Sequence, residues 1–176
     1  MNAKEENTPE KVWDYLMKLS EEFKELGKKL DKTDQIVNGI AKSNGDMAED
    51  TIYNALEQDM TFAGIEFNEI SKNIKRKDTK NNIRTELDVL LTNGDTIAVI
   101  ETKYKVRKND VEDLVTTKAV KFRKLFSEFN NYKLLLGIGG MSFEDDAIDE
   151  AENNGVGIIK IIGDKVEYHT EGIKTY

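Results

Sequence analysis

Two strand-like runs joined by a tight-turn signal constrain the fold of this 176-residue chain more than any other feature. The runs are IRTELDVLLT (83–92) and TIAVIETKYKV (96–106), and Asn93-Gly94 stands between them. Asn and Gly both tolerate the positive φ angles that two-residue hairpin turns require. The sequence therefore predicts an antiparallel β-hairpin over residues 83–106.

The same turn predicts the register of the hairpin, and with it a cluster of charge. The predicted cross-strand pairs are Glu86 with Glu101, Asp88 with Val99, and Arg84 with Lys103. Alternation then places four ionisable side chains on one face and three apolar ones on the other. The ionisable set is Asp88, Glu86, Glu101 and Lys103, and the apolar set is Leu87, Val89 and Leu91.

Carboxylates about 5 Å apart across a strand pair repel each other and raise each other's pKa. Positive charge must therefore lie beside them, and Lys103 supplies one such charge. Cysteine is absent and His169 is the only histidine, which excludes disulfides, cysteine nucleophiles and zinc sites with two histidines. A divalent cation with oxygen ligands, Mg²⁺ or Mn²⁺, is the natural source of the remaining charge.

Asp88, twelve intervening residues and then Glu101-Thr102-Lys103 resembles the D…(D/E)xK signature of the PD-(D/E)XK nuclease superfamily. The resemblance covers roughly residues 45–168, with Leu87 where the name-giving proline would stand. It implies an α/β restriction-endonuclease-like fold, an αβββαβ core whose mixed central sheet is flanked by helices. It also implies metal-dependent hydrolysis of DNA phosphodiesters, with Asp88 and Glu101 binding Mg²⁺ (or Mn²⁺) and Lys103 positioning the attacking water.

The resemblance further implies that a carboxylate on the preceding helix, Glu49, joins the metal site. Glu49 also follows Asp46 at the spacing of a capping box, so it has an alternative role at a helix start. Glu86 is either a metal ligand, an outer carboxylate or the ion-pair partner of Arg84 or Lys103. His169 is expected to be a surface or interface residue on the last strand.

The whole ionic face has an alternative interpretation as an ordinary solvated face of a sheet. Ile97 and Val99 share the predicted face with Glu101, so an apolar row turns ionic at one end. Solvated faces are polar throughout, and this difference favours a functional site.

A second pattern, at the N-terminus, is an apolar spacing that alternates four and three over residues 12–40. Its members are Val12, Leu16, Leu19, Phe23, Leu26, Leu30, Thr33, Val37 and Ile40, of which only Thr33 is polar. This spacing predicts a long coiled-coil helix that pairs with a second chain, and packing on its own domain is the alternative. Trp13 and Tyr15 are expected to pack on or beside the seam.

Ser43-Asn44-Gly45-Asp46 predicts that one helix stops and another starts. The expected domains are therefore 1–44, an oligomerisation helix, and 45–176, the nuclease-like domain. The other expected elements are a helix to about Met60, an extended stretch at 62–74, a basic loop at 75–82 and a helix at 109–132. A buried parallel strand at 133–140, a helix at 142–154 capped by Ser142 and a strand pair about Gly163-Asp164 complete the chain.

The net charge of −8 conceals a basic middle segment. Residues 72–124 contain 14 Lys or Arg against 8 Asp or Glu. Since no aromatic residues interleave with them, they predict contact with a phosphate backbone rather than base recognition. The predicted DNA-contacting residues are Lys75, Arg76, Lys77, Lys80, Lys105, Arg107 and Lys108.

The leading hypothesis is a dimeric Mg²⁺-dependent endonuclease acting on DNA. One alternative is a catalytically inactive nuclease-fold protein that serves as a coiled-coil assembly or nucleic-acid-binding module, and another is a phosphoesterase acting on nucleotides or RNA. No segment approaches the roughly 20 apolar residues of a membrane span, so we expect no membrane association and a cytoplasmic location.

Overall fold

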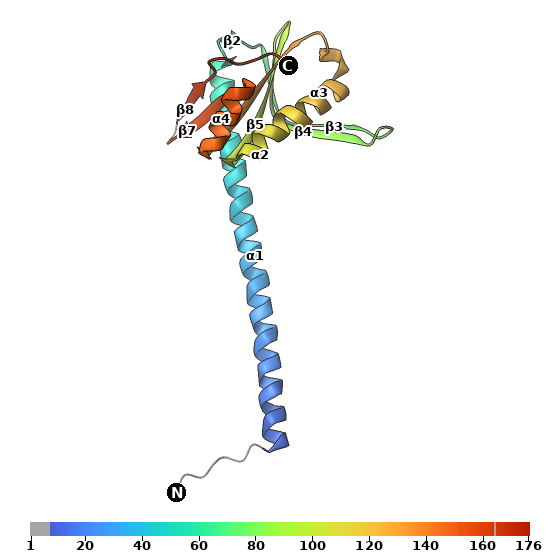
Figure 1. Cartoon of the computed structure of the whole chain (residues 1–176), viewed down its shortest axis with the longest axis vertical. Coiled ribbons are helices and arrows are strands. Elements are labelled where there is room, and N and C mark those ends of the chain that lie inside the picture. The colour runs from blue at the N-terminus through green and yellow to red at the C-terminus, as the bar shows by residue number, and fades with distance from the viewer. Residues whose placement is uncertain (1–7, 164) are drawn as a thin grey trace. The chain divides into compact units, whose positions relative to one another are not determined.

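A computed structural model describes residues 8–163 and 165–176, which form a mixed α/β protein (Figure 1). Contacts divide the chain into two compact units between Ser43 and Asn44. The helices are α1 (Pro9–Asp59), α2 (Lys108–Asp113), the π-helical turn η1 (Leu114–Lys118), α3 (Ala119–Leu125), the 3₁₀ turn η2 (Ser127–Phe129) and α4 (Asp145–Asn154). The strands are β1 (Thr61–Phe62), β2 (Ile65–Glu66), β3 (Glu69–Asp78), β4 (Ile83–Thr92), β5 (Thr96–Val106), β6 (Lys133–Phe143), β7 (Gly157–Ile162) and β8 (Lys165–His169).

Helix α1 is continuous, so the predicted stop and restart at Ser43–Asp46 is wrong. It begins as predicted around Pro9, where the Thr8 hydroxyl accepts a hydrogen bond from the Lys11 backbone N–H at 3.5 Å. Gly45 lies inside the helix with open space around its Cα. An internal glycine costs about 1 kcal/mol relative to alanine, which a long helix tolerates.

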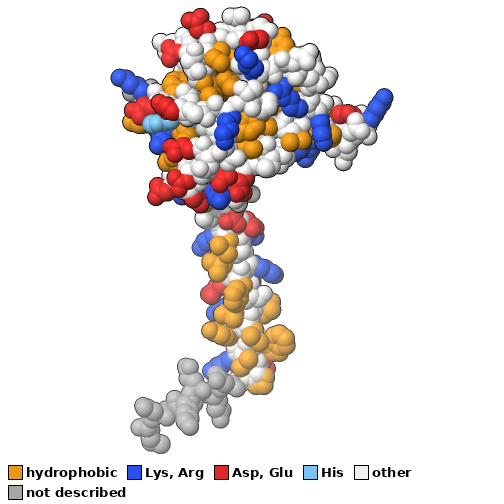
Figure 2. All heavy atoms as spheres, turned by 45° about the horizontal axis from the view of Figure 1, so that its top comes forward, with side chains coloured by type: hydrophobic (Ala, Val, Ile, Leu, Met, Phe, Trp, Pro, Cys, Tyr) orange, Lys and Arg blue, Asp and Glu red, His pale blue; other side chains and the backbone are white. Residues whose placement is uncertain are grey.

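The seam predicted at residues 12–40 is helical throughout, and its apolar side chains are exposed except for half-buried Leu19. Figure 2 shows apolar side chains along this helix among acidic and basic ones. Phe23 is 66% exposed and Leu30 is 58% exposed; Trp13 and Tyr15 are exposed as well. Within the described part of the chain, no helix is long and apolar enough to cross a membrane.

The unit that begins at Asn44 is built on one six-stranded sheet in the order β3-β4-β5-β6-β7-β8. Strands β3, β4 and β5 are antiparallel, β5, β6 and β7 are parallel, and β8 returns antiparallel to β7. The predicted mixed sheet, the hairpin over 83–106, the buried parallel strand and the final strand pair are therefore confirmed.

Each face of this sheet is covered by its own hydrophobic core. On one face, Ala48, Ile52 and Leu56 follow each other at a spacing of four along α1 and pack on β4 to β7 together with Phe62 and Phe67; we term this the α1-side core. On the other face, α2, η1, α3 and α4 cover the α3-side core, whose largest side chains are Phe122, Phe126, Leu87, Ile97, Leu114, Leu134 and Leu136. The sheet is thus a layer buried between helices.

The register of the β4–β5 hairpin differs from the predicted one by two residues. Thr92 pairs with Ile97, and pairing continues to Val89 with Ile100. The side chain of Asn93 accepts hydrogen bonds from the backbone N–H groups of Asp95 and Thr96, at 3.0 and 2.8 Å. Neither Asn93 nor Gly94 has a positive φ, so the expected two-residue turn is replaced by a longer one closed by this side chain.

Three element boundaries also differ from prediction. The stretch Lys75–Asp78, expected in a loop, extends β3, because an exposed strand does not need alternating apolar residues. The helix expected to reach residue 132 ends with α3 at Leu125, where Phe126 leaves helical geometry. Ser142 lies in β6, and α4 follows Glu144 instead.

Two glycines make room for Phe62 in the α1-side core. Gly137 and Gly157 pair with each other across β6 and β7. A Cβ built on Gly157 would lie 2.6 Å from Cζ of Phe62, and one on Gly137 would lie 2.8 Å from the same atom. The aromatic ring of this buried residue therefore occupies the space that side chains would fill.

We expect Gly157→Ala to lower the free energy of unfolding by about 1–3 kcal/mol, because the added methyl group overpacks this contact. Gly45→Ala is the matched control, since nothing surrounds that position and alanine is the better helix former, so it should raise stability by up to about 1 kcal/mol. Urea unfolding followed by circular dichroism measures both. Equal effects of the two substitutions would contradict the role of Gly157.

Candidate active site

The site is located where β4 separates from β5. Backbone pairing between the two strands ends at Val89 with Ile100, one position before Asp88 and Glu101. Opposite this point, Asn73 of β3 has a left-handed conformation (φ 55°) and no ladder partner, although its neighbours Lys72 and Ile74 pair with β4. The backbone of both strands therefore turns at the level of Asp88.

This turn changes which face β4 presents. Val89 and Leu91 pack in the α1-side core, as alternation requires, but Leu87 packs in the α3-side core. The prediction that Leu87, Val89 and Leu91 share one face is therefore wrong. A left-handed residue in β3 therefore accompanies the break in alternation, at the level where β4 stops pairing with β5 but still pairs with β3.

Asp88 is half-buried and is held by β5. Its Oδ2 accepts a hydrogen bond from the backbone N–H of Thr102 at 2.7 Å and another from the Thr102 hydroxyl at 3.0 Å. Asp88 therefore bridges the strands at the level where their regular pairing has ended.

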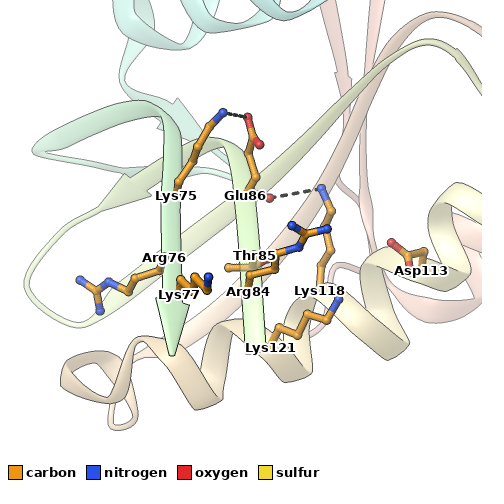
Figure 3. A pocket seen from close by; sticks show the side chains of 9 residues that line it. All are labelled: Lys75, Arg76, Lys77, Arg84, Thr85, Glu86, Asp113, Lys118 and Lys121. Atoms are coloured by element: carbon orange, nitrogen blue, oxygen red, sulfur yellow. Dashed lines mark hydrogen bonds and ion pairs between the residues drawn. The ribbon is translucent and has the colours of Figure 1, made fainter. Parts of the chain in front are cut away.

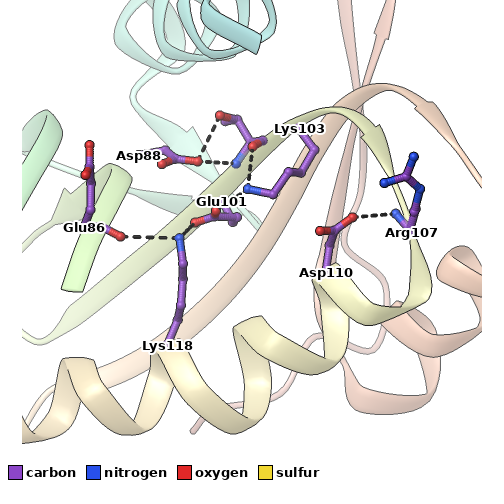
Figure 4. Close-up of polar contacts among 8 residues, drawn as sticks. Glu86, Asp88, Glu101, Lys103, Arg107, Asp110 and Lys118 are labelled. Carbon is purple, nitrogen blue, oxygen red and sulfur yellow. Dashed lines mark hydrogen bonds and ion pairs between the residues drawn. The ribbon is translucent and has the colours of Figure 1, made fainter. Parts of the chain in front are cut away.

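Glu101 is the buried acid of the site, with only 4% of the residue exposed. It continues the row of Ile97 and Val99, both members of the α3-side core, so the predicted shared face is confirmed. Two lysines contact its carboxylate from different sides (Figure 4): Lys103 Nζ lies 2.5 Å from Oε1, and Lys118 Nζ bonds Oε2.

Burial raises the pKa of Glu101, and the nearby charge of Asp88 raises it further, against the lowering effect of the two lysines. For Lys103, burial lowers the pKa, but the charges of Glu101, Asp88 and Asp110 outweigh that effect, so the pKa of Lys103 lies above its usual value. The ammonium form of Lys103 is therefore stabilised beside Glu101.

Lys118 is the site residue that sequence reasoning did not assign. It closes η1, the π-helical turn between α2 and α3, and its side chain is 20% exposed. Sequence analysis placed it only among the basic residues of a helix surface. The position of Glu101 at the end of an apolar row indicated that its carboxylate needs a second cation beside it. Helical periodicity could not identify Lys118 as that cation, because a π turn shifts the positions of the side chains.

Glu49 has no capping role, because α1 does not start near Asp46. It is half-buried on the last turns of α1, and burial and the charge of Asp88 raise its pKa, while Asn73 and Lys72 lower it. Asp88 thus lies within electrostatic reach of both Glu49 and Glu101. The structure brings Glu49 to the site that contains Asp88.

Glu86 does not join this site, and the predicted convergence of three hairpin carboxylates is wrong. Its carboxylate pairs with Lys75 of β3 at 3.0 Å, because the shifted register removes Glu86 from Glu101. Over residues 8–163 and 165–176, no group of three or more Asp, Glu or His side chains is arranged to hold a metal ion. The carboxylates that lie near each other are Asp88 with Glu49 and Asp88 with Glu101.

Five of the seven basic residues predicted to contact DNA are ion-paired within the protein. The pairs are Lys75 with Glu86, Arg76 with Glu128, Lys105 and Arg107 with Glu144, and Lys108 with Glu112 and Glu150. Arg76 also stacks on the Phe126 ring at 4.0 Å and donates to the Leu125 carbonyl. Lys77 and Lys80 have no such pair in the described part of the chain.

A basic cavity of about 620 Å³ adjoins the carboxylates (Figure 3). It lies between the β3–β4 hairpin and the helical segment of η1 and α3, and Lys118 belongs both to its lining and to the Glu101 site. Its lining residues are Lys75, Arg76, Lys77, Arg84, Thr85, Glu86, Asp113, Lys118 and Lys121. The acidic site and the basic cavity therefore share one side chain.

His169 lies on β8, as predicted, at the edge of the sheet opposite β3, and 4.0 Å from Glu167.

The sequence matches no protein-family model and no curated protein. The geometry of the site is therefore the basis for any functional conclusion.

The raised pKa of Glu101 predicts a pH dependence of stability. Because the folded-state pKa lies above the unfolded value, the folded protein holds this proton more tightly, and the resulting stabilisation is lost as pH rises through the folded-state pKa. We expect the stability of the wild type relative to Glu101→Gln to fall from about pH 4.5 towards neutrality. Urea unfolding at a series of pH values measures this difference, and an increase with pH would contradict the assignment.

Proposed function

We propose that the unit beginning at Asn44 is a metal-dependent nuclease with a restriction-endonuclease-like fold that hydrolyses phosphodiester bonds in DNA. The observation that carries the proposal is the meeting of Asp88, Glu101 and Lys103 where β4 leaves β5, with the pKa of Glu101 raised by its burial and then by the charge of Asp88. The order of helix α1, three strands of the six-stranded sheet (β3, β4 and β5), the helices from α2 to α3, and strand β6 supports the same fold.

The chemistry of the donors fits a hard divalent cation. Asp88 and Glu101 offer carboxylate oxygens, and mutual repulsion disfavours their joint ionisation unless positive charge is added. They would hold Mg²⁺ or Mn²⁺, with Glu49 as a further carboxylate on the side of Asp88. Such an ion polarises a phosphate and lowers the pKa of a bound water.

Lys103 supplies the group that acts on the water. Because its pKa is raised, its ammonium stays protonated at neutral pH, so it donates hydrogen bonds and does not serve as a general base. It is anchored to Glu101 and to the Thr102 carbonyl, the latter at 3.2 Å, which places the donor beside the acid pair. In this role Lys103 orients the water and offsets the negative charge that develops on the phosphate.

One observation favours a second candidate, a nuclease-fold module that binds nucleic acid without cleaving it. Both oxygens of Glu101 already contact a lysine, so this acid is neutralised by the chain itself. A site of this kind holds its charge balance without a cation. Titration with Mn²⁺ separates the two candidates, because only the nuclease should bind the ion at Asp88 and Glu101.

We further propose that α1 forms a homodimer through residues 12–40. Eight of the nine seam positions are apolar, and burial of exposed Phe23, Leu26 and Leu30 would stabilise a coiled coil. Residues 9–43 contain seven Lys and seven Asp or Glu, so two copies of this segment do not repel each other. A second copy of the chain is therefore the occupant that suits this helix.

Lys103→Ala is expected to reduce Mg²⁺-dependent cleavage of duplex DNA by at least about 100-fold, because the donor to the water is lost. Asp88→Asn is expected to abolish Mn²⁺ binding measured by calorimetry. Exposed Lys165 of β8 is the control, and Lys165→Ala should change neither result. Full cleavage by Lys103→Ala would refute the assigned role, and cleavage by no form of the protein would favour the non-catalytic module.

Phe23→Glu combined with Leu30→Glu is expected to convert the dimer to a monomer and to reduce helicity, since charges replace two seam layers and most helical stability in proteins comes from packing of an apolar face. Sedimentation equilibrium and the ellipticity at 222 nm measure these changes. Lys28→Glu, on the side of the helix away from the seam, should leave the dimer intact. If the wild-type protein were a monomer, the proposed dimer would be wrong, but the proposed catalytic site would be unaffected.

A further inference from the structure

Two cavities that share lining residues adjoin each other along the β3–β4 hairpin. The 620 Å³ cavity and a neighbouring cavity of about 430 Å³ share Arg84 and Lys121 in their linings. One wall comes from β3 and β4, and the other comes from η1 and α3. We term this the basic groove; Lys77, Arg84, Lys121 and Lys124 are its cationic residues that form no ion pair with a carboxylate among residues 8–163 and 165–176.

The lining of the basic groove contains seven Lys or Arg side chains and two acidic ones, Glu86 and Asp113. Lys77 and Arg84 are directly opposite each other on β3 and β4, and like charges in that relation are destabilising. No carboxylate of the described residues forms an ion pair with either of them or with Lys121. Figure 3 shows Lys77, Arg84 and Lys121 around the same space, whereas Arg76 points away. An external anion would relieve this repulsion.

The shape of the basic groove favours a chain of anions over a single one. Its cations extend from Lys118, beside Glu101, through Arg84 and Lys121 to Lys124 in the second cavity. A phosphodiester backbone presents charges in a row and releases counterions when several cations bind it. A single small anion would neutralise only one end of this row.

Lys118 connects the basic groove to the acid. Its Nζ bonds Oε2 of Glu101 and also lies 3.4 Å from the Glu86 carbonyl oxygen, on the cavity side. The lysine stem reaches this position from the last residue of η1. The same ammonium is therefore shared between a buried carboxylate and a cavity lined with cations.

We propose that the basic groove binds a phosphodiester backbone and that Lys118 exchanges Glu101 for a backbone phosphate when this occurs. This inference rests on the proposed function for the identity of its ligand. The exchange breaks the Lys118–Glu101 ion pair and forms a Lys118–phosphate pair, with no change in covalent bonding. It leaves Oε2 of Glu101 without its lysine, so binding in the basic groove prepares the acid to accept a cation.

Thermodynamic linkage makes this coupling testable without any metal. Anything that weakens the hold of Glu101 on Lys118 must strengthen binding in the basic groove. Glu101→Gln should therefore tighten binding of duplex DNA, and Lys118→Met should weaken it. The gain from Glu101→Gln should disappear when Lys118→Met is also present, because the released ammonium is then missing.

The experiment measures anisotropy of a fluorescein-labelled 20-base-pair duplex with full-length protein in EDTA. We expect Glu101→Gln to tighten binding at least about threefold in the wild-type background and less than about 1.5-fold in the K118M background. Asp88→Asn is the charge control, since it removes one nearby negative charge but does not contact Lys118, and its effect should be the same in both backgrounds. An equal gain from Glu101→Gln in both backgrounds would overturn the exchange.

A second measurement tests the basic groove itself. Arg84→Gln should weaken binding and lower the slope of log affinity against log salt by about 0.9, whereas Lys165→Gln should change neither. Arg84→Gln also removes the repulsion from Lys77, so it should raise the melting temperature. Weaker binding with a raised melting temperature would reflect a lost contact with DNA and not unfolding of the variant. An unchanged slope, or displacement of the duplex by inorganic phosphate at equal phosphate concentration, would overturn the backbone as ligand.

An assay of DNA cleavage with Mg²⁺, run in parallel, distinguishes the proposed hydrolysis from the proposed exchange of Lys118. DNA binding with the expected coupling but no cleavage would overturn the hydrolytic function and support the exchange. Cleavage with additive effects of Glu101→Gln and Lys118→Met on binding would overturn the exchange alone. Absence of DNA binding would overturn both.

Discussion

The site depends on one interaction, the double ion pair that holds the buried Glu101 carboxylate between Lys103 and Lys118. A buried charge without a partner costs several kcal/mol, and burial of Glu101 is unavoidable because its strand continues the apolar row of Ile97 and Val99. The two lysines come from different elements, β5 and η1, so the pair also ties the helical layer to the sheet at this point. The same two ion pairs therefore balance the charge of Glu101 and hold the helical layer against the sheet.

The double ion pair of Glu101 is possible because the backbone pairing of β4 with β5 ends at Val89, before the two strands end. Parallel strands β5, β6 and β7 form the buried centre of the sheet, and Phe62 packs over paired glycines there. The β3–β4 hairpin is held to that centre only as far as Val89. Beyond this point, left-handed Asn73 turns the hairpin, which opens space for Asp88 on one side and for the basic groove on the other.

Sequence reasoning predicted the mixed sheet, the hairpin and the face of Glu101, because these follow from alternation and from long apolar runs. It did not predict the register, because it assigned Asn93 and Gly94 to a two-residue turn, whereas the Asn93 side chain closes a longer turn by accepting hydrogen bonds from Asp95 and Thr96. It also placed Leu87 on the wrong face, because the left-handed conformation of Asn73 lies on the neighbouring strand. Lys118 was missed for a similar reason: its position depends on a π turn, whereas periodicity assumes a regular helix.

The hairpin carboxylates were expected to lie too close together to be tolerated without a cation, but the charged groups around Glu101 differ from that expectation. Glu86 leaves the cluster and Lys118 enters it, so the acid is balanced by the chain itself. That balance is conditional, however, because the basic groove presents Lys118 with unneutralised cations on its other side. A polyanion in the basic groove would attract Lys118 and restore the original imbalance at Glu101. The proposed cation site would then be strongest with a polyanion in the basic groove, so the acidic site and the basic groove would act together.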